Sequence, residues 1–372
     1  MENKTTQALE SIKERLREFT VACTDGADLV WENDNSEPIP ISRSQFPIPS
    51  LILYVLNGLC MFPQGYRGDK THWMIPFVYQ DVNCAISHEK FGVRLYIHTK
   101  YQHQINPDEL LGKLRKAIEI SEKYILAEIA QDQIKSGNIT IENHFHKLRS
   151  QYHYFRKQAA SIYSEDIDNI LKIFPVRSEG SYNSLAMIDS YFSFLEHFFV
   201  LALPFSSYDR ATDNLVDFVG AIWSKKLQRI LDIKNPTIHG YYNCLVEIKE
   251  KYRNTFAHGG FEKKGQSFYF HLPDYGAIPA SMSAYRNSVH FNFFPIEESS
   301  FQEICTLLDQ FDDLLKSSAL VQAWKFAESG LHLTLDEKNL SEIILAASDP
   351  ISFDSWLEKE SYLSDMYANA DY

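Results

Sequence analysis

Hydrophobic and polar positions divide the chain into two parts with different periodicities. Between residues 50 and 105, apolar and β-branched residues form short runs, separated by Gly, Pro, Asn and Asp: LILYVL, HWMIPFVY, CAIS and VRLYIHT. Such runs predict the strands of a small sheet. An amphipathic helix is expected over residues 1–20, followed by an irregular, Pro- and Asp-rich connection over 24–49. We therefore expect residues 1–105 to form a small α+β domain.

The pattern becomes helical after residue 105. Asn106 suits an N-cap, Pro107 suits the first turn, and Asp108 and Glu109 follow, so a long helix is expected to start here and to stop at Gly137. Two strand-like segments, QSFYFHL and VHFNFF, flank a turn-rich loop and predict a β-hairpin insertion at about 266–294. Further helices are expected at 141–163, 182–203, 212–232, 238–258, 298–328 and 336–347. Residues 106–372 are thus predicted to be a mainly α domain.

Composition narrows the function classes. The net charge of −13 over 372 residues argues against a broad nucleic-acid-binding coat, but leaves room for a local basic groove. Five scattered cysteines without a CxxC pair indicate free thiols in a reducing compartment. The longest apolar runs, 50–62 and 191–205, are too short to span a bilayer, and the charged N-terminus is not a signal peptide. No metal-binding or nucleotide-binding motif is present, so we expect a cytoplasmic protein without metal, cofactor or membrane partner.

The segment KYRNTFAHGG, residues 251–260, ends an expected helix. Its apolar stripe consists of Tyr241, Leu245, Ile248, Tyr252 and Phe256. Asn254 and His258 are neighbours one turn apart, and Gly259-Gly260 is a helix stop. A structural alternative is that Arg253 and His258 only complement the helix dipole. Arg67 and His72 repeat the spacing in a segment without helical periodicity, so the spacing alone is not evidence of function.

The surroundings of this segment resemble the HEPN superfamily (higher eukaryotes and prokaryotes nucleotide-binding domains). The signature of that family is Arg, four to six residues, then His, commonly with a polar residue after the Arg; here these are Arg253, Asn254 and His258. The apolar segment 187–205, which carries Glu196, and the segment 214–233 are also similar to the helices that precede the motif. The resemblance covers roughly 182–265, and more loosely 141–330, and implies a HEPN-like helical bundle.

The resemblance implies an RNA endonuclease that needs no metal, with a role as a toxin or phage-defence effector. The ribose 2′-OH attacks the adjacent phosphodiester and leaves a 2′,3′-cyclic phosphate. His258 would transfer protons, Arg253 would stabilise the phosphate, and Asn254 would orient the imidazole or bind an oxygen. The expected partners are RNA, with tRNA as one candidate, a second copy in a homodimer, and an antitoxin or trigger protein. Positions 253 and 258 differ by about 140° around a helix, which suits a shared site.

Other residues have two readings each. Glu196 would pair with Arg253 in the family-like arrangement, or belong to a solvated helix stripe. Lys225, Lys226 and Arg229 would form a phosphate-binding rim, or a solvated helix end. The aromatic and basic stretch 144–157 would stack on unpaired bases, or be an amphipathic helix with a basic face. The alternative for the whole protein is a non-catalytic HEPN-like module that binds RNA, a nucleotide or a partner protein.

Overall fold

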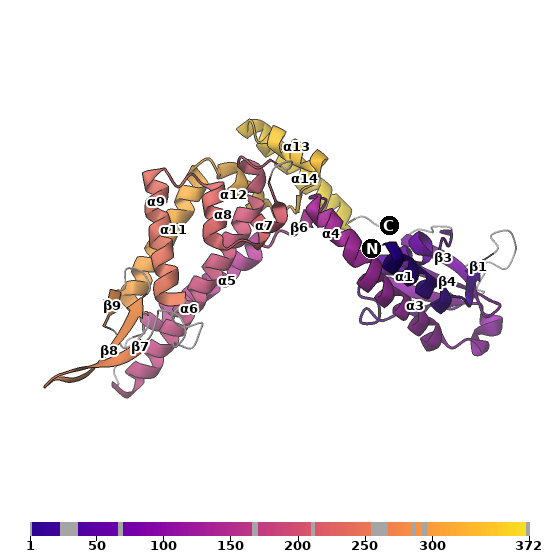
Figure 1. The fold of residues 1–372 in the computed structure, drawn as a ribbon, viewed down its shortest axis with the longest axis horizontal. Coiled ribbons are helices and arrows are strands. Elements are labelled where there is room, and N and C mark those ends of the chain that lie inside the picture. Colours follow the sequence, from indigo (N-terminus) through magenta and orange to yellow (C-terminus); the bar gives the residue numbers. More distant parts are fainter. Residues whose placement is uncertain are drawn as a thin grey trace. The chain divides into compact units, whose positions relative to one another are not determined.

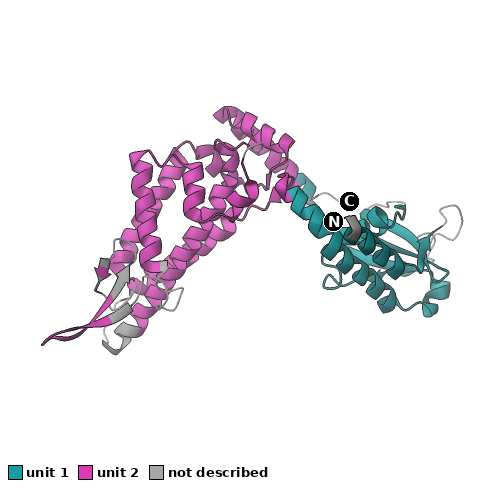
Figure 2. Cartoon of the chain, in the orientation of Figure 1, with its two compact units in different colours: residues 1–133, 366–372 teal, residues 134–365 magenta. Residues whose placement is uncertain are grey.

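The computed structural model describes residues 2–22, 36–65, 70–165, 170–209, 213–253, 267–283, 288–291 and 296–369. This part of the chain is mainly helical and contains a small antiparallel sheet (Figure 1). It divides into two compact units, Met1–Gln133 with Met366–Tyr372, and Ile134–Asp365 (Figure 2). The mainly α fold with a smaller α+β part is therefore confirmed at this level.

The first unit is a five-stranded antiparallel sheet with helices on one face. The strands lie in the order β1-β3-β4-β5-β2. Pairing sets Phe77 of β3 opposite Cys84 of β4, and Ile86 of β4 opposite Leu95 of β5. These side chains pack with Ile12 of α1 and other helical residues in one core. The elements are α1 (Glu2–Arg15), β1 (Phe19–Val21), β2 (Ile39–Pro40), α2 (Pro49–Leu53), η1 (Tyr54–Leu59), β3 (Thr71–Tyr79), β4 (Val82–Glu89), β5 (Gly92–Ile97), η2 (Thr99–Gln104), α3 (Pro107–Ser121), η3 (Glu122–Leu126) and α4 (Ala127–Lys135).

Two expectations for this unit need correction. The run LILYVL is not a strand but helix, because Pro49 occupies the first turn of α2 and Ile52, Val55 and Leu56 bury one helical face. The helix after Asn106 starts as predicted, with the Asn106 side chain accepting the Asp108 N–H at 3.0 Å. However, this helix buries its leucines in the first core, so the structure divides the chain at residue 133 and not near 105.

The second unit is built around two long neighbouring helices, α5 and α6. Its core is rich in aromatic rings, among them Phe145, Phe194, Phe198 and Trp324, whose centroids lie 5.2 to 6.5 Å apart. The elements are β6 (Thr140–Ile141), α5 (Phe145–Tyr163), α6 (Ile170–Leu201), η4 (Leu203–Phe205), α7 (Leu215–Gly220), α8 (Trp223–Ile230), α9 (Pro236–Ile248), η5 (Lys249–Arg253), β7 (Ser267–Leu272), β8 (Gly276–Ser283), β9 (Ser288–His290), α11 (Glu298–Ser317), α12 (Val321–Ser329), β10 (Leu333–Thr334), α13 (Glu337–Ala346) and α14 (Pro350–Asn369).

Most of the helices expected in the second unit are present, but several of their predicted bounds are wrong. The helix expected over 212–232 is two helices, α7 and α8, because Ala221 and Ile222 adopt extended backbone between them. The helix expected over 298–328 is likewise divided into α11 and α12. The predicted insertion contains strands, but they pair differently: QSFYFHL forms β7, and the segment expected to be a loop contains β8, which pairs with both β7 and β9. Helix α14 was not anticipated.

Candidate functional site

Helix α9 carries the segment that precedes the Arg–His motif. It begins after Asn235, whose side chain accepts the Thr237 N–H at 2.9 Å. The predicted apolar stripe is confirmed for Leu245, Ile248 and Tyr252, which are buried. After Ile248 the helix widens into a π-helical turn, η5, which ends at Arg253. Such turns are rare inside helices and often occur at functional sites.

The three predicted catalytic residues lie at the end of this turn or beyond it. The structure describes the backbone of Arg253 as the last residue of η5, but its side chain, Asn254 and His258 lie outside the described residues. Their roles, and the pairing of Arg253 with Glu196, therefore stay predictions. Both α6 and β8 contact η5.

Lysine and aromatic side chains join this turn to the neighbouring helices. The Lys249 ammonium, in the first position of η5, lies 5.5 Å from the ring centre of Phe192 and 5.4 Å from that of Trp223. Phe192 belongs to α6 and Trp223 to α8, so one cation contacts both helices. The arrangement brings α6, α8 and the end of α9 together.

Glu196 connects α6 to α8. One of its carboxylate oxygens accepts the backbone N–H of Trp223, the first residue of α8, at 3.3 Å. The N-cap residue of α8 is Ile222, which has no side-chain acceptor, so Glu196 takes the place of a local cap. This contact accounts for an acid among the aromatic residues of this part of α6.

The three basic residues of α8 have three different environments. Lys226 is only 5% exposed; burial lowers the pKa of its ammonium, and the nearby Glu196 opposes this effect. Arg229 donates to Asp213 at 2.6 Å and to both the hydroxyl and the carbonyl oxygen of Ser207 at 3.0 Å. Lys225 is exposed. Among these three side chains, Lys225 is therefore the one open to a phosphate.

His197, next to Glu196 on α6, has a structural role that the sequence pattern did not indicate. Its Nε2 accepts the backbone N–H of His144 at 2.8 Å, at the start of α5. Burial, with His144 and Lys226 nearby, lowers the pKa of His197 to about 4. The ring is therefore neutral at pH 7 and able to accept this hydrogen bond.

The two arginines of α5, Arg149 and Arg156, are used within the fold. The Arg149 guanidinium lies 4.9 Å from the ring centre of Trp324 and 3.2 Å from the Asp312 carboxylate. Arg156 donates to both carboxylate oxygens of Asp309. The amphipathic-helix reading of 144–157 therefore describes these two arginines better than the base-stacking reading.

A small hollow lies beside the turn that ends at Arg253. It has a volume of about 230 Å³ and lies between the α9–η5 helix and α11. Its lining combines apolar side chains with a cation and two carboxylates: Cys244, Glu247, Ile248, Lys251, Tyr252, Ser300, Glu303, Ile304 and Leu307. A hollow of this size next to the motif offers space for part of a nucleotide, but not for a whole one.

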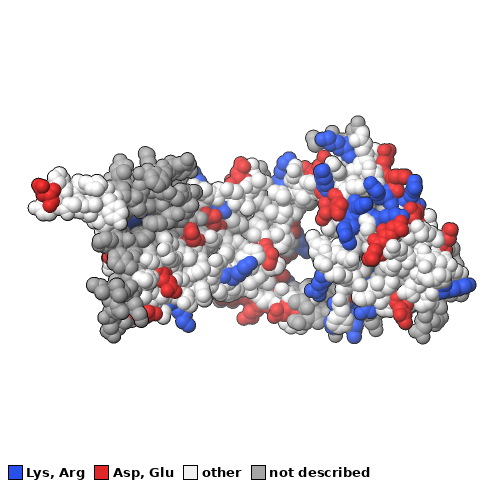
Figure 3. All heavy atoms as spheres, turned by 90° about the horizontal axis from the view of Figure 1, so that it is seen from below, with Lys and Arg blue, Asp and Glu red and all other residues white. Residues whose placement is uncertain are grey.

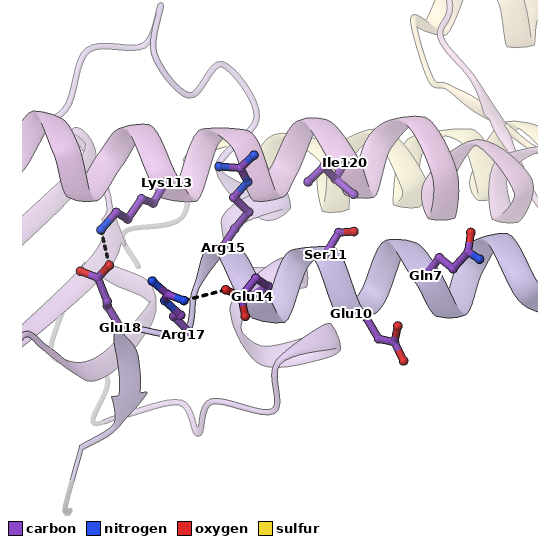
Figure 4. Close-up of a pocket in the computed structure, with 9 residues that line it drawn as sticks. All are labelled: Gln7, Glu10, Ser11, Glu14, Arg15, Arg17, Glu18, Lys113 and Ile120. Atoms are coloured by element: carbon purple, nitrogen blue, oxygen red, sulfur yellow. Dashed lines mark hydrogen bonds and ion pairs between the residues drawn. The ribbon is translucent and has the colours of Figure 1, made fainter.

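The first unit contains a larger groove of about 850 Å³ between α1 and α3 (Figure 4). Figure 4 shows Lys113 reaching from α3 to Glu18, at 2.7 Å, and Arg17 lying against Glu14, at 2.8 Å. Acids and bases alternate along this groove, and these pairs neutralise much of its charge. It therefore has no net preference for an anionic ligand.

Charge on the visible surface is mixed. On the face drawn in Figure 3, Lys and Arg side chains lie among Asp and Glu side chains over the first unit, while the described surface of the second unit is mostly uncharged. The described side chains on this face form no extended basic stripe of the kind that coats nucleic acid. In the described part of the chain, no helix combines the length and apolar character that a membrane crossing needs.

Comparison with known protein families, with characterised proteins and with solved structures finds no match to this chain. The HEPN resemblance therefore rests on the residues of the motif and on the helices that precede it.

Proposed function

We propose that the protein is a metal-independent endoribonuclease of HEPN type, which acts as a toxin or phage-defence effector. The observation that carries the proposal is the meeting of three helices at the π turn that ends at Arg253. Helix α6, α8 and the π turn ending at Arg253 are joined by Glu196 and Lys249. This is the arrangement expected if the helices before the motif serve to position it.

The proposed chemistry uses groups of the chain alone. The 2′-oxygen of the ribose loses its proton to the imidazole of His258 and forms a bond to the adjacent phosphorus. The P–O5′ bond breaks, and the 5′-oxygen receives a proton from an imidazolium. Arg253 stabilises the added negative charge on the non-bridging oxygens. The products carry a 2′,3′-cyclic phosphate and a 5′-OH.

Two motifs, one from each copy of a homodimer, would supply the base and the acid. A histidine with a pKa near its ordinary value of about 6.5 can take either role at neutral pH. Lys225 on α8 would contact a neighbouring phosphate, because it is exposed where Lys226 and Arg229 are not.

The test is RNA cleavage by the purified protein in EDTA, with analysis of the product ends. We expect cyclic phosphate ends, and loss of about 10²–10⁴-fold in rate for His258→Ala. Arg253→Ala should lose about 10²–10³-fold. Arg253→Lys should recover only part of this loss, because a lysine ammonium lacks the planar fork of arginine.

Two matched controls separate catalysis from general effects. His239→Ala changes an exposed histidine at the other end of α9, and Arg67→Ala changes the copy of the spacing in the first unit. Both variants should cleave like the wild type. Equal activity in His258→Ala and His239→Ala, or cleavage that disappears in EDTA and returns with Mg²⁺, would overturn the proposal.

One observation favours a second candidate, a non-catalytic HEPN-like module. Arg229 is paired with Asp213 and Lys226 is buried, so the rim predicted to hold RNA is reduced to Lys225. Such a module would bind RNA or a partner without cleaving it. The non-catalytic function would be supported if the protein bound RNA saturably and cleaved it under none of these conditions.

A further inference from the structure

A second hollow in the first unit has a single sign of charge. Its volume is about 230 Å³, and it lies between the segment that follows β2 and the turn that joins β4 to β5. Nine residues line it: Ile41, Arg43, Phe46, Pro47, Pro49, His88, Lys90, Gly92 and Val93. Three of them carry, or can carry, a positive charge, and none of these described residues is acidic. In a chain with a net charge of −13, such a lining is unusual.

The framework of this hollow is well defined. The Ile41 N–H donates to the Val93 carbonyl at 3.0 Å, which holds the covering segment against β5. Ile41, Phe46 and Val93 are each at most 8% exposed and make an apolar floor. Gly92 has φ +127°, a backbone conformation that favours glycine, and nothing lies within 4 Å of the position of a Cβ there. The floor is therefore rigid, and the rim next to Gly92 is open.

Strand alternation turns Glu89 away from the hollow. His88 and Val93 are cross-strand partners on one face of the sheet, so Glu89 points to the other face. There the Glu89 carboxylate accepts the Ser87 and Tyr96 hydroxyls at 2.8 and 2.6 Å, and lies 3.2 Å from Arg94. The Glu89 charge is thus satisfied on the other face of the sheet. Arg43 is exposed and makes no hydrogen bond or ion pair with the part of the chain that the structure describes.

We propose that this hollow is a binding site for the phosphate group of a small phosphate monoester. Arg43 offers the planar donor pair that suits a phosphate, and Lys90 and His88 line the same hollow from the strand side. The volume is below that of sites enclosing a drug-sized ligand, so it holds the phosphate and the first atoms of the organic group. Pro47 and Pro49 provide an apolar rim for the rest of the ester. The site is independent of the ribonuclease proposal.

Calorimetric titration of the full-length protein with phenyl phosphate, inorganic phosphate and phenol tests this site. We expect saturable binding of phenyl phosphate, weaker binding of inorganic phosphate and none of neutral phenol. Arg43→Gln should weaken phenyl phosphate binding about tenfold or more. The matched control, Lys116→Gln, removes one exposed charge of α3 outside the hollow and should change binding less than about twofold. Arg43→Lys, which keeps the charge, should fall between the two.

Inorganic sulfate provides a second readout, because it stays doubly charged over the whole pH range where His88 titrates. Burial, and then His72 stacked at 4.5 Å, lower the pKa of His88, and the Trp73 ring at 5.9 Å also faces it. Sulfate binding should strengthen as pH falls below about 6.5, where a histidine with a lowered pKa gains its proton, and His88→Gln should weaken this dependence. Equal affinity in Arg43→Gln and Lys116→Gln, or no saturable binding of phenyl phosphate at millimolar concentration, would overturn the proposal.

Discussion

Replacing Arg149 by alanine is expected to destabilise the second unit strongly. Its guanidinium lies over the rings of Trp324, Phe145 and Phe194 and beside Asp312. Asp312 is only 5% exposed and also accepts the Tyr191 hydroxyl at 2.9 Å. Arg149→Ala leaves this carboxylate buried without its counter-charge, which costs about 3–5 kcal/mol in comparable buried pairs. Arg149→Ala also removes the cation–π contacts of the guanidinium. This loss is not added in full to the cost of the buried carboxylate, because one truncation removes both interactions.

Two further variants separate the buried charge from the mere loss of a side chain. Arg156→Ala breaks the pair with Asp309, whose side chain is 51% exposed and can be hydrated again, and removes a donor to the Tyr152 hydroxyl, so a cost of about 1–2 kcal/mol is expected. In Arg149→Met combined with Asp312→Leu, both charges are gone and the Tyr191 hydroxyl keeps the Leu308 carbonyl at 3.3 Å as a partner. This double variant should recover most of the lost stability.

The assay is urea unfolding at pH 7 and pH 4.5, followed by hydrogen exchange in peptides of α5 and α6 so that the second unit is observed separately. Burial, opposed by Arg149, raises the pKa of Asp312 in the folded state. Without Arg149, the pKa of Asp312 in the folded state should rise further. The loss in free energy of unfolding caused by Arg149→Ala should therefore shrink as pH falls and Asp312 becomes protonated. A deficit below about 1 kcal/mol, or an equal deficit at both pH values, would refute the reasoning.

Two more predictions concern the ribonuclease proposal. Sedimentation at micromolar concentration should show a homodimer, since the site needs two motifs; a monomer that cleaves RNA fully would contradict the shared site. Lys225→Ala should weaken RNA binding and reduce its salt dependence by about one phosphate contact, because Lys225 is exposed. Arg229→Ala should leave RNA binding unchanged and lower stability by about 1 kcal/mol, because Arg229 is occupied by Asp213 and Ser207. If Arg229→Ala weakened RNA binding and Lys225→Ala did not, the phosphate-binding rim would be formed by Arg229 and not by Lys225.

Local sequence signals determined most of the elements. The cap at Asn106, the strands β3, β4 and β5 and the stripe of Leu245, Ile248 and Tyr252 follow from local sequence patterns, and the structure contains them, whereas β1 and β2 were not expected. LILYVL was misread because a short apolar run fits both a strand and a buried helix. The break at Ala221 and Ile222 was missed because the group that caps α8 there is Glu196, on another helix.

The sequence by itself determined that the chain has a helical bundle, a small sheet and an Arg–His motif after a helix. Only the tertiary structure decided what the charged side chains do. Lys226 and Arg229 share one short helix with Lys225, yet the first is buried and the second is paired. Likewise, Arg149 lies in an aromatic core, and Arg43 lines a hollow with no acid among its described lining residues. The reason is physical: local preferences depend on residues within one or two turns, whereas desolvation and pairing depend on which distant elements approach a side chain.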